Sequence, residues 1–172
     1  MKKILSLVDD IYEDLELWYP KLRLEEEGWQ VTVAAPESNR VFQGKHGYPC
    51  KANQDIADVE TADYDALLVP GGFAPDKLRR DPNVLRIVQE FDAAKKPIAF
   101  ICHAGWILIS AGILKGRTAT STVGIKDDMI NAGCEWLNEA LVIDGNLISS
   151  RTPIDLPVFG KAFVDAIKAQ DA

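Results

Sequence analysis

The sequence has few of the residues that build metal sites or disulfide-stabilised folds. It has three cysteines, Cys50, Cys102 and Cys134, and two histidines among 172 residues. An odd number of cysteines without paired spacing does not form a disulfide framework, and it is typical of a reducing compartment. Because histidines are so scarce and no Cys-x-x-Cys motif occurs, we expect no metal site.

Positive charge and long apolar runs are also scarce. Lysine and arginine total 19 against 26 acidic residues, which gives a net charge of −7. Binding to nucleic acid or to an anionic membrane needs clustered positive charge, so we expect neither. The apolar run from Ile4 to Val8 is too short for a signal-peptide core, and no stretch is long enough to span a bilayer. We therefore expect a soluble, cytoplasmic protein.

The residues that are present predict a globular α/β fold. Hydrophobic residues make up 47% of the chain and charged residues 26%, proportions typical of a packed domain. Lys3 to Val8 and Gln30 to Ala35 have the pattern of strands, and Glu13 to Glu27 has that of a helix with one solvated face. This strand–helix–strand order predicts a parallel sheet covered by helices on both sides.

The same pattern continues to the end of the chain. We expect strands at 64–69 and 97–101, helices at 82–94, 124–132 and 157–169, a further helix from His103 to about Gly112, a turn or small hairpin at 44–48, and a hairpin at 141–148. The chain contains no internal repeat and no low-complexity segment. It is therefore predicted to form one domain, residues 1–172.

Cys102 is the strongest candidate for a reactive residue. It follows the apolar run Pro97 to Ile101 and precedes His103 and an apolar helical stretch. A reactive atom on a sharp turn between strand and helix is held at the end of a sheet, within reach of a substrate. The helix-terminal N–H groups there favour a thiolate. Cys50 and Cys134 lack such a setting, and we interpret them as structural.

Two further features surround this cysteine in the predicted sheet. Gly71 and Gly72 also follow a strand, so their N–H groups could bind a substrate oxyanion, although Pro-Gly-Gly can equally be a tight turn. His103 is adjacent to Cys102, and adjacent residues on a regular helix do not face each other. It can assist the thiol only where the turn distorts the backbone, and a catalytic imidazole usually needs an orienting carboxylate.

Glu13 is the candidate acid, because it lies after the first strand and faces the same rim as Cys102. A protonated glutamic acid there could hydrogen-bond a thiolate and transfer protons. The alternative is that Glu13 is a first-turn acid that complements the dipole of the helix it begins.

Several short motifs, taken together and in order, make the chain resemble the PfpI family, within the superfamily that includes the Parkinsonism-associated protein deglycase and intracellular cysteine peptidases. The motifs extend over nearly the whole chain. They are Tyr12-Glu13-Asp14-Leu15-Glu16-Leu17, Gly44-Lys45-His46-Gly47, Leu68-Val69-Pro70-Gly71-Gly72, Ile101-Cys102-His103, Leu108-Ile109-Ser110-Ala111-Gly112, Gly124-Ile125-Lys126-Asp127-Asp128, Asn131-Ala132-Gly133 and Ser150-Arg151-Thr152-Pro153.

The resemblance implies a flavodoxin-like, three-layer αβα sandwich similar to class I glutamine amidotransferase domains, and an enzyme without a cofactor. Cys102 would be the nucleophile and Glu13 the carboxyl group beside its sulfur. The backbones of Gly71, Gly72 and His103 would bind the oxyanion.

The resemblance also implies an oligomer, a homodimer or a hexamer. In peptidase-like members the histidine pairs with an acid of a neighbouring subunit, and Asp76 stands at that position here. It replaces a glutamate and has a shorter reach. His103 is followed by Ala104-Gly105-Trp106 instead of Gly-Pro, and Thr122-Val123 replaces a Tyr-Pro, so the role of that tyrosine is not carried over.

Three functions remain open on the sequence alone. The first, which we favour, is a cysteine enzyme of stress protection that acts on reactive carbonyls, of the glyoxalase or deglycase type, with methylglyoxal, its adducts or glycated protein as substrate. The second is an intracellular cysteine peptidase or amidase with a triad completed across a subunit interface. The third is a non-enzymatic stress protein whose Cys102 senses oxidation.

Overall fold

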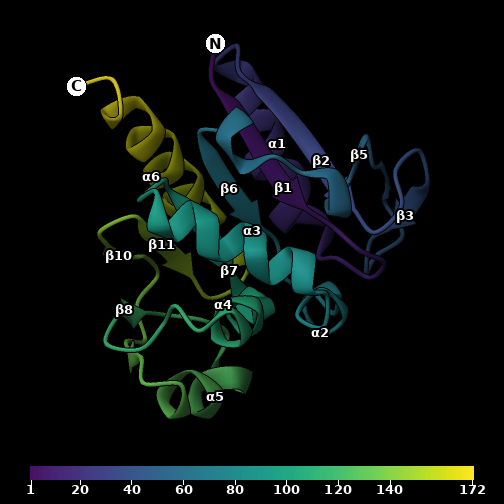
Figure 1. Cartoon of the computed structure of the whole chain (residues 1–172). Helices are drawn as coiled ribbons and strands as arrows, with labels where there is room; N and C mark the ends of the chain where they lie inside the picture. The colour runs from purple at the N-terminus through teal and green to yellow at the C-terminus, as the bar shows by residue number, and fades with distance from the viewer.

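A seven-stranded sheet forms the centre of the computed structural model, which describes residues 1–172 (Figure 1). The strands lie in the order β10-β11-β7-β6-β1-β2-β5, and every neighbouring pair is parallel except β10 and β11. The predicted, mainly parallel sheet is therefore confirmed. The strands are β1 Lys3–Leu7, β2 Gln30–Ala35, β5 Gln54–Asp55, β6 Ala66–Val69, β7 Ile98–Ile101, β10 Val142–Asp144 and β11 Leu147–Ser150.

Helices cover both faces of this sheet and complete the expected three-layer sandwich. On one face α1 (Asp14–Glu26) packs against α6 (Leu156–Ala169), and on the other α3 (Pro82–Ala93) packs against α4 (Gly105–Ala111) (Figure 1). The start of α3 shows why the sequence predicted it. Asp81 caps the helix by accepting a hydrogen bond from the N–H of Asn83, and Pro82 takes the first helical position, where its missing N–H costs nothing.

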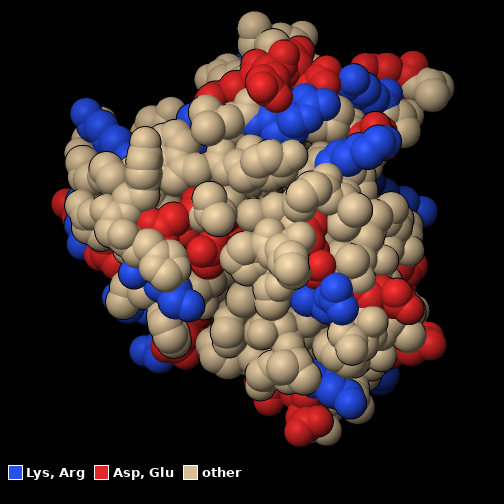
Figure 2. Space-filling model, turned by 180° about the vertical axis from the view of Figure 1, so that it is seen from behind, with Lys and Arg blue, Asp and Glu red and all other residues tan.

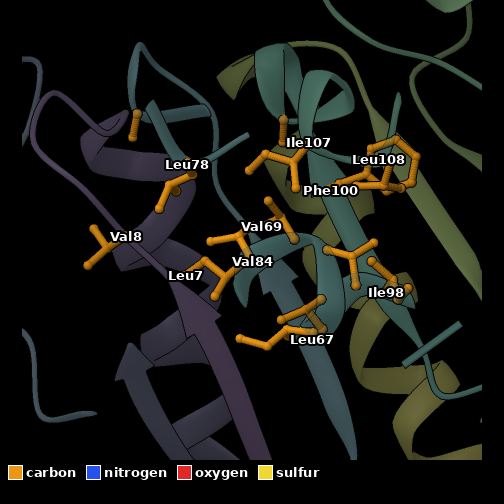
Figure 3. Packing of buried hydrophobic residues seen from close by; sticks show 14 of the residues in the cluster. Leu7, Val8, Leu67, Val69, Leu78, Val84, Ile98, Phe100, Ile107 and Leu108 are labelled. Atoms are coloured by element: carbon orange, nitrogen blue, oxygen red, sulfur yellow. The ribbon is translucent and has the colours of Figure 1, made fainter. Parts of the chain in front are cut away.

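Each face of the sheet has its own apolar core, because strands buried on both sides carry apolar residues at successive positions. All four residues of β6 are buried, as are all four of β7. Leu67, Val69 and Phe100 belong to the core beneath α3 and α4 (Figure 3). Leu68 belongs to the opposite core, with Phe159 of α6. The alternation along β6 therefore fixes which side chains face which helices.

The strand order places three loops at one edge of the sheet. β1, β6 and β7 are parallel neighbours, so their carboxyl ends meet at the same edge. After β1 the chain enters α1 on one face, and after β6 it continues through α2 (Ala74–Leu78) to α3 on the other. A change of direction of this kind opens a crevice outside the strand ends, where ligands bind in open α/β sheets.

Two hairpins and several short elements complete the fold. The predicted turn at 44–48 joins β3 (Val41–Gln43) and β4 (Pro49–Lys51), and the predicted turn between β10 and β11 contains Gly145 with a positive φ of 58°. The sequence did not predict α2 or the two-residue strands, because elements this short have almost no periodicity. The remaining elements are α5 Lys126–Asn131, β8 Thr118–Ala119 and β9 Glu135–Trp136.

No helix of the structure combines the length and apolar character needed to cross a bilayer. On the face opposite to the view of Figure 1, basic side chains lie in small groups among acidic ones, with broad uncharged areas between them (Figure 2).

One residue of the loop after β1 is strained. Ile11 has a φ of 64°, in the left-handed region that β-branched residues rarely adopt. Its N–H donates to the carbonyl of Gln43, and its carbonyl accepts from the N–H groups of Phe73 and Ala74. These hydrogen bonds tie together the loops that follow β1 and β6 and the hairpin of β3 and β4. They hold Ile11 in a conformation that costs about 1–3 kcal/mol.

We predict that Ile11→Gly raises the free energy of unfolding by about 1 kcal/mol, because glycine adopts this conformation without strain. Chemical denaturation measures the change. Val41→Gly is the matched control, since Val41 is a similarly exposed β-branched residue in a strand with no positive φ, and we expect it to destabilise the protein. Equal destabilisation by both changes would show that Ile11 is not strained.

Candidate active site

Cys102 lies at a sharp bend between β7 and α4, as the sequence predicted. It begins a 3₁₀ turn, Cys102–Ala104, and its φ is 63°. Its carbonyl accepts a hydrogen bond from the N–H of Thr122, at 3.2 Å, which ties the bend to a second loop. A non-glycine residue keeps such a conformation only where its surroundings impose it, and residues of this kind cluster at functional sites.

The carboxyl group that meets this thiol belongs to Glu16, in the first turn of α1. Its side chain is fully buried, and its Oε1 accepts a hydrogen bond from the N–H of Gly71 at 2.9 Å. The second oxygen, Oε2, has no hydrogen-bond partner, while the Cys102 thiol lies beside the carboxyl group and interacts with it. A buried carboxyl oxygen without another partner costs free energy unless it interacts with the sulfur.

Glu13, the residue that the sequence suggested for this position, has a different place. It precedes α1 as its N-cap, and its Oε2 accepts a hydrogen bond from the N–H of Glu16 at 2.9 Å. Its side chain lines the same pocket, with Oε1 3.9 Å from Nε2 of His46. Glu13 and Glu16 are about one helical turn apart, and the sequence pattern alone does not indicate which of the two reaches the sulfur. The contact with the sulfur therefore belongs to Glu16 rather than Glu13.

The close approach of Glu16 and Cys102 requires a glycine between them. A Cβ on Gly71 would lie 2.6 Å from Oε1 of Glu16 and 2.8 Å from Cβ of Cys102. Both distances are shorter than van der Waals contact allows. Gly71 therefore lets the loop after β6 pass between the carboxyl group and the cysteine while donating its N–H to the carboxyl group.

Burial and mutual repulsion govern the protonation of this pair. Burial and the nearby Glu13 raise the pKa of Glu16 to about 8, so its carboxyl group holds a proton at neutral pH. Burial also raises the pKa of the Cys102 thiol, and the Glu16 carboxylate raises it further. While Glu16 is protonated that repulsion is absent, and its O–H can donate to sulfur. The two groups thus titrate as one coupled unit.

The three predicted oxyanion donors do not all point to the same place. The N–H groups of Gly72 and His103 are directed at the sulfur, where they lower the pKa of Cys102. The N–H of Gly71 is already bonded to Glu16. Gly72 has a φ of 84°, and a Cβ there would lie 2.5 Å from the backbone N of Glu13. Gly72 and His103 are therefore free to bind an oxygen next to the sulfur, whereas Gly71 positions the acid.

His103 reaches Cys102 although the two are adjacent in sequence. Its Nδ1 lies 3.2 Å from Sγ, because the positive φ of Cys102 turns the backbone out of the helical path. The ring packs between Phe73 and Trp106, with centroids 6.4 Å and 5.1 Å away. Burial and the positive charge of Lys45 lower the pKa of His103. The imidazole is therefore neutral at physiological pH and can accept a proton.

Asp76, the predicted partner of His103, does not contact it within one chain. It lies in α2, where its Oδ2 pairs with Nη2 of Arg80 at 2.7 Å, and its side chain is 49% exposed. No carboxylate of the same chain accepts a hydrogen bond from His103. Its proposed pairing across a subunit interface stays a prediction.

These groups surround a pocket of about 300 Å³. Thr122 lines it at the position where the resemblance has a tyrosine, and Thr152 and Pro153 complete the wall after β11. Lys45 also lines the pocket, a contribution that the sequence reasoning missed. Lys45 stands in the motif Gly44-Lys45-His46-Gly47, which pointed to the family but not to a role in the site. Glu16 likewise stands in the motif around Glu13, which did not distinguish the roles of the two acids.

Glu13, Asp14 and His46 bring possible metal ligands within 4.8 Å of one another. Asp14 already accepts hydrogen bonds from the N–H groups of His46, at 2.8 Å, and Tyr48, at 2.9 Å. Glu13 caps α1. These contacts account for Asp14 as a support of the β3–β4 turn and for Glu13 as the cap of α1, and the expectation of no metal site remains a prediction.

We predict that Gly71→Ala lowers the rate of Cys102 alkylation by iodoacetamide at least about tenfold, because the new methyl group displaces either Glu16 or the cysteine. Mass spectrometry of the Cys102 peptide measures this rate. Gly124→Ala is the matched control, since its Cβ would meet nothing closer than 3.9 Å, at Nε2 of His103. An unchanged rate in Gly71→Ala would contradict the close packing described here.

The raised pKa of Glu16 also predicts how stability depends on pH. The ordinary value is 4.5 and the folded value about 8, so the folded state binds this proton more tightly than the unfolded state. This contribution to stability is complete below about pH 4.5 and is lost as pH rises through 8.

Glu16→Gln removes this titration. We therefore expect the wild-type free energy of unfolding, minus that of Glu16→Gln, to fall by about 4 kcal/mol between pH 5 and pH 9. Urea unfolding of both proteins across this range measures the difference, and the titration of all other groups largely cancels in it. A difference that stays constant with pH would show that Glu16 titrates normally.

Comparison with known proteins identifies the family of the chain. Residues 2–166 match the model of the DJ-1/PfpI family. The chain is 47% identical to "Deglycase PfpI" of Pyrococcus furiosus, over 96% of this chain and 99% of that protein. It is 40% identical to "Putative cysteine protease YraA" of Bacillus subtilis, over 97% and 99% of the two chains.

Solved structures show the same fold. The DJ-1/ThiJ/PfpI-like and ferritin-like two-domain protein of Anabaena variabilis matches with a TM-score of 0.95 and 40% identity over 96% of this chain, which spans about half (48%) of that protein. DJ-1beta of Drosophila melanogaster matches with a TM-score of 0.88 and 24% identity, over 96% of this chain and 90% of that one. The chain therefore belongs to the DJ-1/PfpI family.

Proposed function

We propose that this protein is a cofactor-independent cysteine enzyme that converts reactive 2-oxoaldehydes such as methylglyoxal, free or as adducts of amines and thiols, into hydroxy acids. The observation that carries the proposal is the buried Glu16 carboxyl group beside Cys102, which holds a proton at neutral pH. The names of two relatives, a deglycase and a putative cysteine protease, support a cysteine enzyme of this family.

The first step is addition of the Cys102 sulfur to the aldehyde carbon. The S–C bond forms, the carbonyl π bond opens, and the oxygen becomes an alkoxide. The N–H groups of Gly72 and His103 are directed at the region around the sulfur where this oxygen would lie. The thiol proton passes to the alkoxide through Glu16 or His103, which gives a neutral hemithioacetal.

The second step moves a hydrogen between adjacent carbons. Glu16 gives its proton to the neighbouring carbonyl oxygen and, now a carboxylate, removes the proton on the former aldehyde carbon, whose C–H electron pair forms a C=C bond. Glu16 then protonates the second carbon, and the hydroxyl group on the first carbon returns a proton to the Glu16 carboxylate, which leaves a C=O bond and gives a thioester. The substrate is oxidised at one carbon and reduced at the next, so no external oxidant is needed. A carboxyl group with a pKa near ambient pH suits both proton transfers.

The last step is hydrolysis. Water adds to the thioester carbonyl, the S–C bond breaks, and Cys102 leaves with a proton while the hydroxy acid is released. His103 is positioned to activate this water, since its Nδ1 is 3.2 Å from the sulfur and its imidazole is neutral. With a glycated amine or thiol as substrate the first step differs: the bond from the carbon to the amine or thiol breaks, this group leaves with the thiol proton, and the Cys102 sulfur takes its place. The later steps are the same.

A peptidase is the second candidate, and the contact between His103 and Cys102 favours it. Nucleophile and base are already within 3.2 Å of each other. The orienting acid, however, would have to be Asp76 of a neighbouring copy, and in one chain this side chain pairs with Arg80. The carbonyl reaction needs only groups that a single chain brings together. A redox sensor would use the same Cys102 thiol, and no contact in the site favours this role over the two enzymatic ones.

A homodimer or hexamer and a role in stress protection remain part of this proposal. Phe73 lines the pocket with its side chain 56% exposed, and two other large apolar side chains, each next in sequence to a pocket residue, are also exposed: Val123 at 74% and Ile154 at 83%. An apolar rim of this kind suits contact with a second copy or with the side chains of a glycated protein.

We predict that purified protein forms lactate from methylglyoxal, that Cys102→Ala abolishes the reaction, and that Glu16→Gln lowers kcat at least about 100-fold, because no other buried acid meets the sulfur. Glu13→Gln is the matched control. It keeps an oxygen that can cap α1, and we expect less than about a tenfold loss.

An enzymatic lactate assay and a peptide-hydrolysis assay, run in parallel with His103→Ala, separate the candidates. Lactate formation that persists in Cys102→Ala would contradict the proposed mechanism. Robust proteolysis that is lost in His103→Ala, without lactate formation, would favour the peptidase. Activity on neither substrate would favour the redox sensor, and mass spectrometry of Cys102 after peroxide treatment would test that role.

A further inference from the structure

Lys45 places a positive charge at the mouth of the Cys102 pocket. It is the only lysine or arginine that lines this pocket, and its ammonium group forms no ion pair with any carboxylate of the chain. Its Nζ lies 5.7 Å from the centre of the Phe73 ring, which in turn stacks on His103. The side chain is therefore folded over the entrance of the pocket.

The loop that carries Lys45 is held firmly in place. The backbone N–H of Lys45 donates to the carbonyl of Tyr12 at 2.7 Å. The carboxylate of Asp14 accepts hydrogen bonds from both His46 and Tyr48, so it braces the turn on either side. A Cβ on Gly44 would lie 2.8 Å or less from the Asp14 carboxylate. The position of Lys45 therefore depends on the packing of this turn against the start of α1.

The charge of Lys45 acts on every reactive group of the site. It lowers the pKa of Glu16, of Cys102 and of His103. Two acids face it. Glu16 is protonated at neutral pH, and the carboxylate of Glu13 accepts the N–H of Glu16. Neither pairs with Lys45, so its ammonium group keeps its capacity to bind an anion that enters from solvent.

We propose that Lys45 is a specificity residue of this site, whose ammonium group binds a carboxylate carried by the substrate close to its reactive carbonyl. This rests on the proposed function for its biological meaning, but the anion preference is a property of the pocket itself. The site then favours aldehydes that carry a carboxylate next to the reactive carbon, such as glyoxylate, over neutral dicarbonyls of the same size, such as glyoxal. It also retains the carboxylate of a hydroxy acid formed within it.

The test uses two alkylating reagents of nearly the same shape. Iodoacetate is anionic and iodoacetamide is neutral, and both react by attack of the Cys102 sulfur on the methylene carbon with loss of iodide. Mass spectrometry of the Cys102 peptide gives both rates. A change in the thiolate fraction alters the two rates equally, so their ratio reports only the attraction of the anion.

We expect the ratio of the iodoacetate rate to the iodoacetamide rate to fall about three- to tenfold in Lys45→Gln, and to be restored in Lys45→Arg. In the wild type the ratio should fall with added salt. Lys51→Gln is the matched control, because it removes the same charge from an exposed position in the neighbouring strand β4. Its ratio should stay at the wild-type value.

A second arm tests the substrate class without assuming turnover. Glyoxylate and glyoxal have the same length, and both add reversibly to thiols, but only glyoxylate is charged. We expect glyoxylate to protect Cys102 from iodoacetamide at about threefold or more lower concentration than glyoxal does, and Lys45→Gln to remove this advantage.

An alkylation ratio that is the same in wild type, Lys45→Gln and Lys51→Gln would overturn the inference, whatever the enzyme assays show. A ratio that responds to Lys45 in a protein that forms no lactate would leave the inference standing and reject the proposed carbonyl reaction instead.

Discussion

The site depends on one constraint, the close approach of the Glu16 carboxyl group to the Cys102 thiol on either side of Gly71. The three residues lie in the segments that follow β1, β6 and β7, and a parallel sheet brings the ends of these strands to one edge. Gly71 permits the approach because it has no side chain, and it holds the acid through its N–H. The bend at Cys102 and the turn at Gly72 both follow from packing three chain segments into this space.

This constraint also determines the chemistry. A carboxyl group buried beside a thiol cannot easily ionise, so it keeps its proton and becomes an acid and base near neutral pH. The backbone N–H groups of Gly72 and His103 and the charge of Lys45 oppose the burial that raises the pKa of Cys102. The thiol, the acid and the fixed positive charge thus form one electrostatic unit, and the loss of any member changes the others.

Most of the fold could be predicted from the sequence, because long elements carry strong signals. Strand β2 was predicted with its observed bounds, and α3 within one residue, since Asp81 and Pro82 mark its start. Short elements such as α2 were missed. In the site, the setting of Cys102 between strand and helix was predictable, because an apolar strand followed directly by a helix is a local pattern.

The identity of the acid was not predictable in the same way. Glu13 and Glu16 lie one helical turn apart, and only tertiary packing decides which one is directed at the sulfur and which one caps the helix. Tertiary packing also decides that the N–H of Gly71 donates to the carboxyl group, whereas the N–H of Gly72 is directed at the sulfur. The place of Lys45 depends on a hairpin that folds back over the pocket, a contact between segments far from Cys102 in sequence.

The most direct test of the account is the protonation state of Glu16. Infrared difference spectroscopy at neutral pH detects the C=O stretch of a buried, protonated carboxyl group. The account predicts such a band in the wild type, its loss in Glu16→Gln and its persistence in Glu13→Gln. Absence of the band in the wild type at neutral pH, or its loss in Glu13→Gln rather than in Glu16→Gln, would contradict the account.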